Sequence, residues 1–311
     1  MNFDRSDLFL DPKVTQYGSH MVMTNVNKPM KKKFYSLDTE FRDDYEEYSK
    51  INPSFYTISI PQRINDVKSI SVMNIEIPLT FYNISSSLEN NIFEVIVGVV
   101  SKTIIIPDGQ YDASGLITAV NYQLGLVGFT GLVFNINGFT SRFSTAAGSY
   151  TINFAVKSSM SSSGTSLNTD FNKFNFKSSF GWILGFRTIQ YVVTNVAAVV
   201  SEALIDLNGP RYLYLVIDDN TQSNPNSFIV PSATSFLNNN IIAKISLDRA
   251  FYTFGKIYLA NDANGWLFGD KRVYTGKVDL QRLKIQLVNE IGLPINLNGQ
   301  DFSFGLEIEY E

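Results

Sequence analysis

The sequence contains no cysteine, so disulfides, thiolate zinc sites, iron–sulfur clusters and cysteine nucleophiles are all excluded. Such a chain can work in a reducing compartment such as the cytosol. It also has a single histidine, His20, in a polar N-terminal stretch. Every mechanism built on a histidine base would have to use that residue. A serine–histidine–aspartate triad or a histidine-ligated zinc protease site is therefore not expected, and we predict that the protein is not an enzyme.

Long apolar runs are also missing. The two longest, residues 92–100 and 189–200, are interrupted by Glu94 and Asn195, whereas a membrane-spanning helix needs about 20 apolar residues. The first residues carry acids where a signal peptide carries bases. The formal net charge of −4 disfavours a large nucleic-acid-binding face, which needs a positive potential. We therefore expect no membrane span and no nucleic-acid partner.

Aromatic residues and alternating apolar positions are abundant. The 311 residues include 24 Phe and 16 Tyr, and aromatic side chains favour strands and interfaces. Residues 55–60 and 67–77 alternate between two faces and stop at Pro61 and Pro78, which is typical of half-buried strands. Further strands are predicted at residues 91–100, 102–106, 132–136, 149–156, 211–217, 241–247, 283–288 and 302–310.

One helix is predicted among these strands. Asp112 or Ser114 can cap it, apolar residues follow at helical spacing, and Gly125 or Gly128 ends it. Many strands, one inserted helix and turn-rich gaps predict an all-β fold, an antiparallel β-sandwich or barrel.

Residues 1–50 differ from the rest and are predicted to form an extended N-terminal arm. They are polar and lack a sustained period, and they include the basic run Lys31-Lys32-Lys33 and an acidic run at residues 43–47. Aromatic residues are scattered through them, whereas disordered tails are poor in aromatics. The arm is therefore expected to order against its own domain or against a neighbour. The lysines suit a solvated stretch or contact with an acidic neighbour.

Acidic side chains give no clear site. Glu307 and Glu309 alternate within a predicted strand, as the polar face of a sheet does, and no spacing singles out the facing pair that a glycosidase needs. Residues 218–220 and 261–265 offer oxygen ligands for calcium, but Asp, Asn and Gly are also ordinary turn residues, and a turn is favoured. No glycine-rich phosphate loop is present. No cofactor and no metal are expected.

Six short stretches between about residue 34 and the C-terminus resemble sequence motifs of a known protein family, and they occur in the same order as in that family. They are residues 34–45, 75–85, 104–111, 184–187, 211–219 and 297–304. The first includes Leu37-Asp38-Thr39-Glu40-Phe41-Arg42-Asp43, which is similar to an (I/L)D(S/T)xxRD opening pattern. Together they resemble the minor capsid proteins of nucleocytoplasmic large DNA viruses, the giant-virus group. The stretch before residue 34 is longer than in many members.

The resemblance implies a jelly-roll β-sandwich domain, which we place at residues 51–311, without catalysis. The implied function is that of a structural virion component, a minor capsid protein in icosahedral capsid assembly. It would stand at the vertex as a penton protein or link capsomers. The implied partners are the major capsid protein, other minor capsid proteins and further copies of the chain, as a pentamer at the vertex. The implied location is the virion capsid, assembled in the host cytoplasm.

The opening pattern also supplies candidate assembly residues. Asp38 and Arg42 lie four residues apart, so they could pair in a helical turn, or cap and anchor the arm where it enters the sandwich. The predicted assembly and anchor set is Lys31, Lys32, Lys33, Phe34, Tyr35, Asp38, Phe41 and Arg42. The alternative is a carbohydrate- or receptor-binding jelly roll on the virion surface. In that case exposed Trp266 and Tyr274 would stack on sugar rings.

Overall fold

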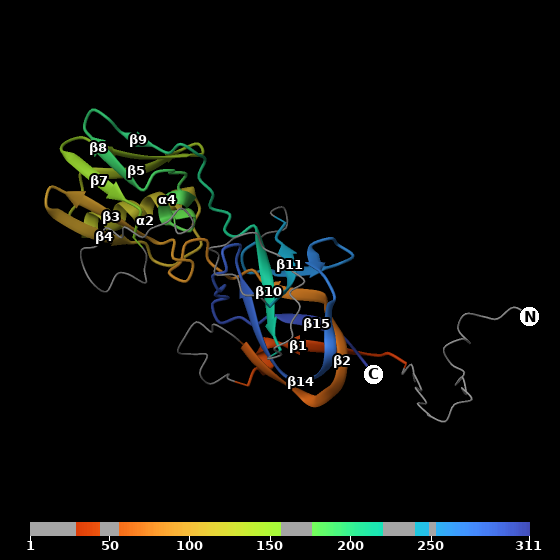
Figure 1. Ribbon diagram of the computed structural model, residues 1–311. Helices are drawn as coiled ribbons and strands as arrows, with labels where there is room; N and C mark the ends of the chain where they lie inside the picture. The colour runs from red at the N-terminus through yellow and green to blue at the C-terminus, as the bar shows by residue number, and fades with distance from the viewer. Residues whose placement is uncertain (1–28, 44–55, 157–175, 220–239, 249–252) are drawn as a thin grey trace, which may run out of the picture.

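The computed structural model describes residues 29–43, 56–156, 176–219, 240–248 and 253–311 (Figure 1). His20, most of the predicted arm and the serine-rich stretch near residue 160 lie outside the described residues. Within the described ranges, no helix is both long and apolar enough to cross a membrane.

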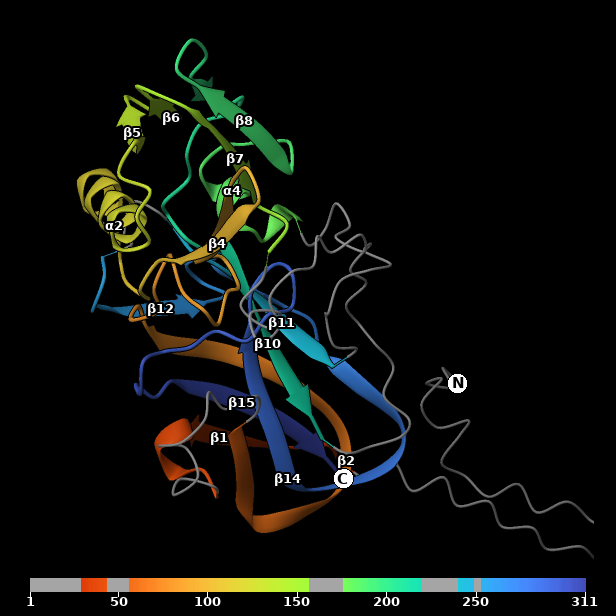
Figure 2. The ribbon, with the colours of Figure 1, turned by 90° about the vertical axis from the view of Figure 1, so that its left-hand side faces the viewer.

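An eight-stranded antiparallel sheet forms one half of the molecule. Its strand order is β1 (Lys31–Asp38), β15 (Ser303–Tyr310), β2 (Tyr56–Pro78), β14 (Arg272–Val288), β10 (Tyr212–Asp218), β11 (Ile241–Ser246) and β13 (Leu267–Gly269), with β12 (Ile257–Asn261) paired to β2. The register of β14 against β2 shifts three times between Val273 and Arg282. Such irregularities bend strands, and both strands curl strongly in Figures 1 and 2. We call this half the body, residues 29–83 and 208–311.

Two smaller antiparallel sheets form the other half, which we call the insert, residues 84–207. One has the order β4 (Val100–Ile105), β3 (Ile92–Val97), β7 (Ser149–Asn153) and β8 (Gln190–Thr194). The other has the order β5 (Leu132–Asn137), β6 (Thr140–Thr145) and β9 (Val199–Val200). The predicted all-β class, with curled antiparallel sheets of a jelly-roll-like kind, is confirmed.

The predicted helix is α2 (Ala113–Leu126), and Asp112 caps it as expected. The Asp112 carboxylate accepts a hydrogen bond from the Gly115 N–H at 2.7 Å. The helix buries Leu116, Val120 and Leu124 in the insert. A second helix, α4 (Phe180–Ile183), was not predicted, because one turn is too short to show a helical period.

Each half has its own main cluster of buried hydrophobic side chains. The body cluster draws on strands from both ends of the chain, for example Ile70 and Leu306. The insert cluster is rich in phenylalanine, and Phe93 stacks on Phe180 with ring centroids 5.4 Å apart. A few side chains cross the division, since Leu88 packs with the body. The elements of the insert therefore pack around their own core.

Part of the predicted arm is a strand of the body. Residues 31–38 form β1, which pairs along its whole length with β15, from Lys31 opposite Tyr310 to Asp38 opposite Ser303. The sheet therefore begins before residue 51, where the sequence placed the start of the domain. Local patterning could not show this, because the partner strand lies at the other end of the chain.

Candidate functional site

The predicted anchor lies where β1 ends and the short 3-10 helix η2 (Thr39–Phe41) begins. The Asp38 carboxylate caps η2 by accepting from the Glu40 N–H at 2.9 Å. The Arg42 side chain is 1% exposed, donates to the nearby Thr39 carbonyl at 2.6 Å and forms an ion pair with Asp301. Asp38 and Arg42 thus have separate partners: the hydrogen bond of Asp38 is local, whereas Arg42 also reaches Asp301, which precedes the neighbouring strand β15.

Asp301 lies in the last of the six resembling stretches and contacts Thr39 and Arg42, which lie in the first. The Thr39 hydroxyl donates to the Asp301 carboxylate at 2.8 Å, and the Phe302 N–H donates to the same hydroxyl at 3.0 Å. The Arg42 guanidinium also lies 5.3 Å from the centre of the Tyr56 ring. Removing one partner of a buried ion pair leaves an uncompensated charge. This cluster therefore holds residues 38–42 firmly on their own domain.

The basic run lies on the outer edge of the same sheet, where an ion-pair network covers its solvent face. Lys32 Nζ lies 2.8 Å from Glu307 and 3.3 Å from Glu309. Glu309 also pairs with Lys271 and accepts from the Ser69 hydroxyl at 2.9 Å. The hydrogen bond from Lys271, then those from Ser69 and Lys32, lower the pKa of Glu309 to about 2. The sequence showed the lysines but not these partners.

The other predicted assembly residues divide between core and surface. Tyr35 packs against the body core, and Lys33 lies 5.2 Å from the centre of the Tyr310 ring. Lys31 is exposed at the start of β1. Phe34 and Phe41 are 69% and 75% exposed. These two phenyl rings are therefore available for contact with another protein.

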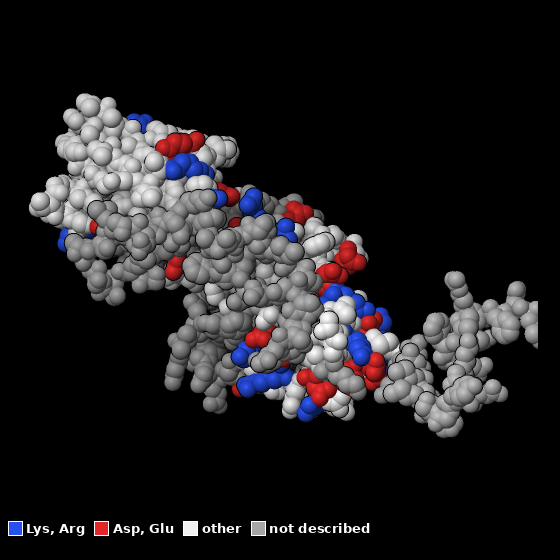
Figure 3. Space-filling model, viewed as in Figure 1, with Lys and Arg blue, Asp and Glu red and all other residues white. Residues whose placement is uncertain are grey.

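The insert has a different surface, poor in charge and rich in exposed apolar side chains. Only 13 of its 124 residues are Asp, Glu, Lys or Arg. Figure 3 shows a largely uncharged face over the insert and interspersed charges over the body. The large hydrophobic side chains exposed on the insert are Val99, Val100, Ile105, Tyr122, Leu126, Val133, Phe139, Ile189, Val192, Val196, Val200 and Leu204. Exposed apolar surface, where it is extensive, marks interaction sites.

The predicted sugar-stacking pair is not available. Tyr274 is only 4% exposed, and its hydroxyl donates to the Asp219 carboxylate at 2.5 Å. Asp219 also pairs with the buried Arg272 at 3.2 Å. Trp266 is half-buried and stacks on Tyr258 with centroids 5.3 Å apart. The expectation that Trp266 and Tyr274 are exposed was wrong, because both rings belong to packed clusters of the body.

The two candidate calcium loops make other contacts. The side chains of Asn261 and Asn264 accept reciprocally from each other's backbone N–H groups at 2.8 and 3.0 Å, which closes a turn. In the other loop, Asp219 is held by Arg272 and Tyr274. Among the described residues, no group of three or more His, Cys, Asp or Glu side chains could hold a metal ion.

Comparisons with known proteins give weak likenesses. The chain matches no protein-family model, and no curated protein matches it significantly in sequence. Among solved structures, the crystal structure of the mavirus penton protein has a TM-score of 0.41 at 12% identity, covering 91% of this chain and 100% of that one. A Sputnik virophage structure determined by cryo-EM has a TM-score of 0.38 at 13% identity, covering 91% of this chain and 98% of that one. At these values the function has to be argued from the residues themselves.

Proposed function

We propose that this chain is a structural component of a virus capsid that acts through protein–protein contacts. The observation that carries the proposal is the surface of the insert. Of the 21 large hydrophobic side chains that are exposed in the described residues, 12 lie on the insert, where charges are scarce. The cores of protein interfaces are depleted in charged residues. Such a surface suits lasting burial against another protein.

The positions of the resembling stretches support the same proposal. The first and the last meet at Asp301, as described above. The second and the third meet at Asn83, whose side-chain amide donates to the Tyr111 carbonyl at 2.8 Å and accepts from the Tyr111 N–H at 2.9 Å. The same amide donates to the Leu207 carbonyl at 2.7 Å, where the chain leaves the insert. These stretches therefore act as joints that fix the shape of the molecule.

More specifically, we propose that the chain is a minor capsid protein of an icosahedral shell, where it stands at the vertex or links capsomers. Its partners are then the major capsid protein, other minor capsid proteins and, at the vertex, four further copies of itself. The exposed rings of Phe34 and Phe41, beside the lysines of β1, offer a second contact region on the body. The protein would reside in the virion capsid after assembly in the host cytoplasm.

Sedimentation of the full chain, alone and with the major capsid protein of the same virus, tests the proposal. We expect a complex, or a five-subunit species, that persists at about 0.5 M salt, where the Debye length falls to roughly 4 to 5 Å. Apolar contacts survive this screening, whereas exposed ion pairs do not. If the chain stays monomeric and does not bind the major capsid protein at either salt concentration, the proposal is overturned.

A pair of matched variants locates the contact. The double substitution Phe139→Ser and Val196→Ser changes side chains of the insert that are 70% and 89% exposed. The control, Met73→Ser with Ile257→Ser, changes side chains of the body that are 46% and 71% exposed. We expect the first variant to weaken the complex and the control to leave it intact. The reverse order would place the contact on the body.

A further inference from the structure

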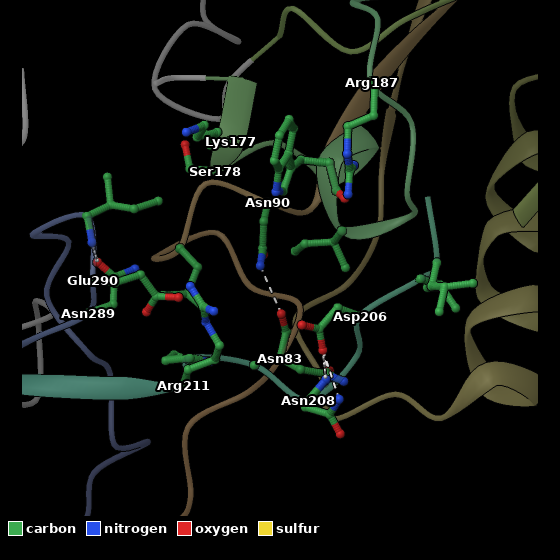
Figure 4. A pocket seen from close by; sticks show the side chains of 18 residues that line it. Asn83, Asn90, Lys177, Ser178, Arg187, Asp206, Asn208, Arg211, Asn289 and Glu290 are labelled. Carbon is green, nitrogen blue, oxygen red and sulfur yellow. Dashed lines mark hydrogen bonds between the residues drawn. The ribbon is translucent and has the colours of Figure 1, made fainter. Parts of the chain in front are cut away.

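A cavity of about 540 Å³ lies where the insert joins the body. Its walls come from residues 83–90, 177–187, 204–211 and 289–291, so both halves contribute (Figure 4). Ligand sites typically enclose about 300 to 1,000 Å³ and often lie between structural units. The cavity is therefore large enough for a ligand of one or two sugar rings.

The body wall presents a buried acceptor, Glu290. Its Oε2 atom is buried and has no hydrogen-bond partner within the described residues. Burial raises the pKa of Glu290, and this rise is partly offset by the backbone N–H of Glu290, by the charge of Arg211 and by the Arg211 N–H. In Figure 4 the Glu290 carboxylate and the Arg211 side chain lie on the same side of the pocket. A buried acceptor without a donor is costly to the protein, and a hydroxyl from a ligand would satisfy it.

The insert wall presents a fixed cation, Arg187. Its guanidinium stacks on the Trp182 ring at 3.9 Å and donates to the Trp182 and Phe186 carbonyls at 3.0 and 2.9 Å. Lys177 lies 5.9 Å from the centre of the same ring. Figure 4 shows the Arg187 side chain directed into the pocket. A guanidinium held in this way is already oriented for a planar carboxylate.

The acids near these cations are engaged with other groups. Asp206 accepts from the N–H and the side-chain amide of Asn208 at 3.1 and 2.8 Å. Glu202 accepts from the Tyr191 hydroxyl at 2.7 Å and from the Arg187 N–H at 3.1 Å. The insert side of the lining thus carries two cations, Lys177 and Arg187, and one carboxylate, Asp206, and the body side carries the Glu290 Oε2 atom, which has no hydrogen-bond partner within the described residues.

We propose that this pocket binds an acidic monosaccharide, with a ring hydroxyl donating to Glu290 Oε2 and the sugar carboxylate held by Arg187. A carboxylate at one end and hydroxyls at the other match the two walls. Apolar side chains such as Ile183 and Ile291 also line the pocket. Such a ligand would bridge the body and the insert. The inference is independent of the capsid role, since a single chain contains the whole site.

Calorimetric titration of the full chain tests this site with four probes: N-acetylneuraminic acid, glucuronic acid, galactose and sodium sulfate. We expect saturable binding of at least one of the two sugar acids, and binding at least about tenfold weaker for galactose, because a charge-assisted hydrogen bond is lost. Sulfate should also bind more weakly, since it cannot reach Glu290. Failure of both sugar acids to bind at millimolar concentration would overturn the proposal, as would equal binding of galactose or of sulfate.

Three variants assign the contacts. Arg187→Gln should weaken sugar-acid binding by about tenfold or more without changing the response to galactose, whereas Glu290→Met should weaken both. The control Arg142→Gln changes an exposed cation of β6 that does not line the pocket, and it should bind as the parent does. Circular dichroism and melting confirm that each variant folds, and Arg187→Met, which also removes the charge, replaces Arg187→Gln if the latter does not fold. Unchanged sugar-acid binding in the folded Arg187 variant would refute the assignment.

Discussion

In the insert, 13 of 124 residues are charged, whereas outside it 41 of 187 are. The body covers the outer face of its sheet with ion pairs such as those among Lys32, Glu307 and Glu309. The insert leaves side chains such as Val99, Phe139 and Val196 in contact with solvent. Exposed ion pairs keep a surface soluble but add little binding energy, whereas apolar surface favours association. Under the proposed function, the body would serve as the framework and the insert as the contact element.

The two halves also differ in how the chain builds them. The body joins β1 and β15 from opposite ends of the sequence, whereas the insert closes its core within one continuous stretch. Because each half has its own main hydrophobic cluster, damage to one core is expected to spare much of the other.

The largest effect is expected for Phe93→Ala in the insert. The ring is fully buried and contacts Phe143, Phe154 and Phe180, and truncating a core phenylalanine costs about 3 to 5 kcal/mol. Calorimetry should show an insert transition at lower temperature and a body transition that moves less. A single transition that shifts as a whole would contradict the separation of the two cores.

The next effect is expected for Asp301→Ala in the body. It removes the Asp301 carboxylate from the Arg42 guanidinium, whose side chain is 1% exposed, and breaking a buried pair costs about 3 to 5 kcal/mol. Because Asp301 itself is 24% exposed, we expect the lower end of that range. Urea unfolding measures the loss. Asp38→Ala is the control, since it removes one cap, which typically contributes about 1 kcal/mol. Equal losses would show that Arg42 does not depend on Asp301.

A smaller and pH-dependent effect is expected for Glu290→Gln at the junction. Burial raises the pKa of Glu290 in the folded protein above its unfolded value. The protonated form therefore favours folding, and this advantage is lost as the pH rises through the folded pKa. The variant, which never ionises, should be more stable than the parent at pH 7 by on the order of 1 kcal/mol. The difference should vanish in acid. Melting curves at pH 4 and pH 7 decide this, and a pH-independent difference would argue against a buried charge.

The smallest effect is expected for Glu309→Gln on the solvent face of the body. The pKa of Glu309 is about 2, below its ordinary 4.5, so its ion pairs stabilise the fold above that range and are lost as the pH falls toward 2. The Glu309 side chain is 13% exposed, but its cations Lys32 and Lys271 are 52% and 42% exposed, and pairs that reach solvent contribute only about 0 to 1 kcal/mol and are screened by salt. The stability difference should therefore shrink at high salt and in acid. A large loss that persists at high salt would mean that this face is as sensitive as a buried core.

Local sequence patterns predicted the strands and helix caps that depend only on neighbouring residues. The alternation at residues 67–77 lies within β2, and the cap at Asp112 begins α2. These patterns could not predict that Arg42 pairs with Asp301, because these residues lie 259 positions apart and each has an ordinary local context. The junction pocket was missed for the same reason, since it draws on four separate segments. The burial of Tyr274 also depends on a distant partner, Asp219, 55 positions away.

If the chain is a capsid component, as proposed, cryo-microscopy of the virion shows directly what covers the insert. We expect neighbouring coat subunits to bury the exposed side chains of the insert, including Val99, Phe139 and Val196. The ion-paired face of the body around Lys32 and Glu309 is expected to stay largely in contact with solvent. A shell in which the insert faces solvent while that body face is buried would contradict the division between framework and contact element.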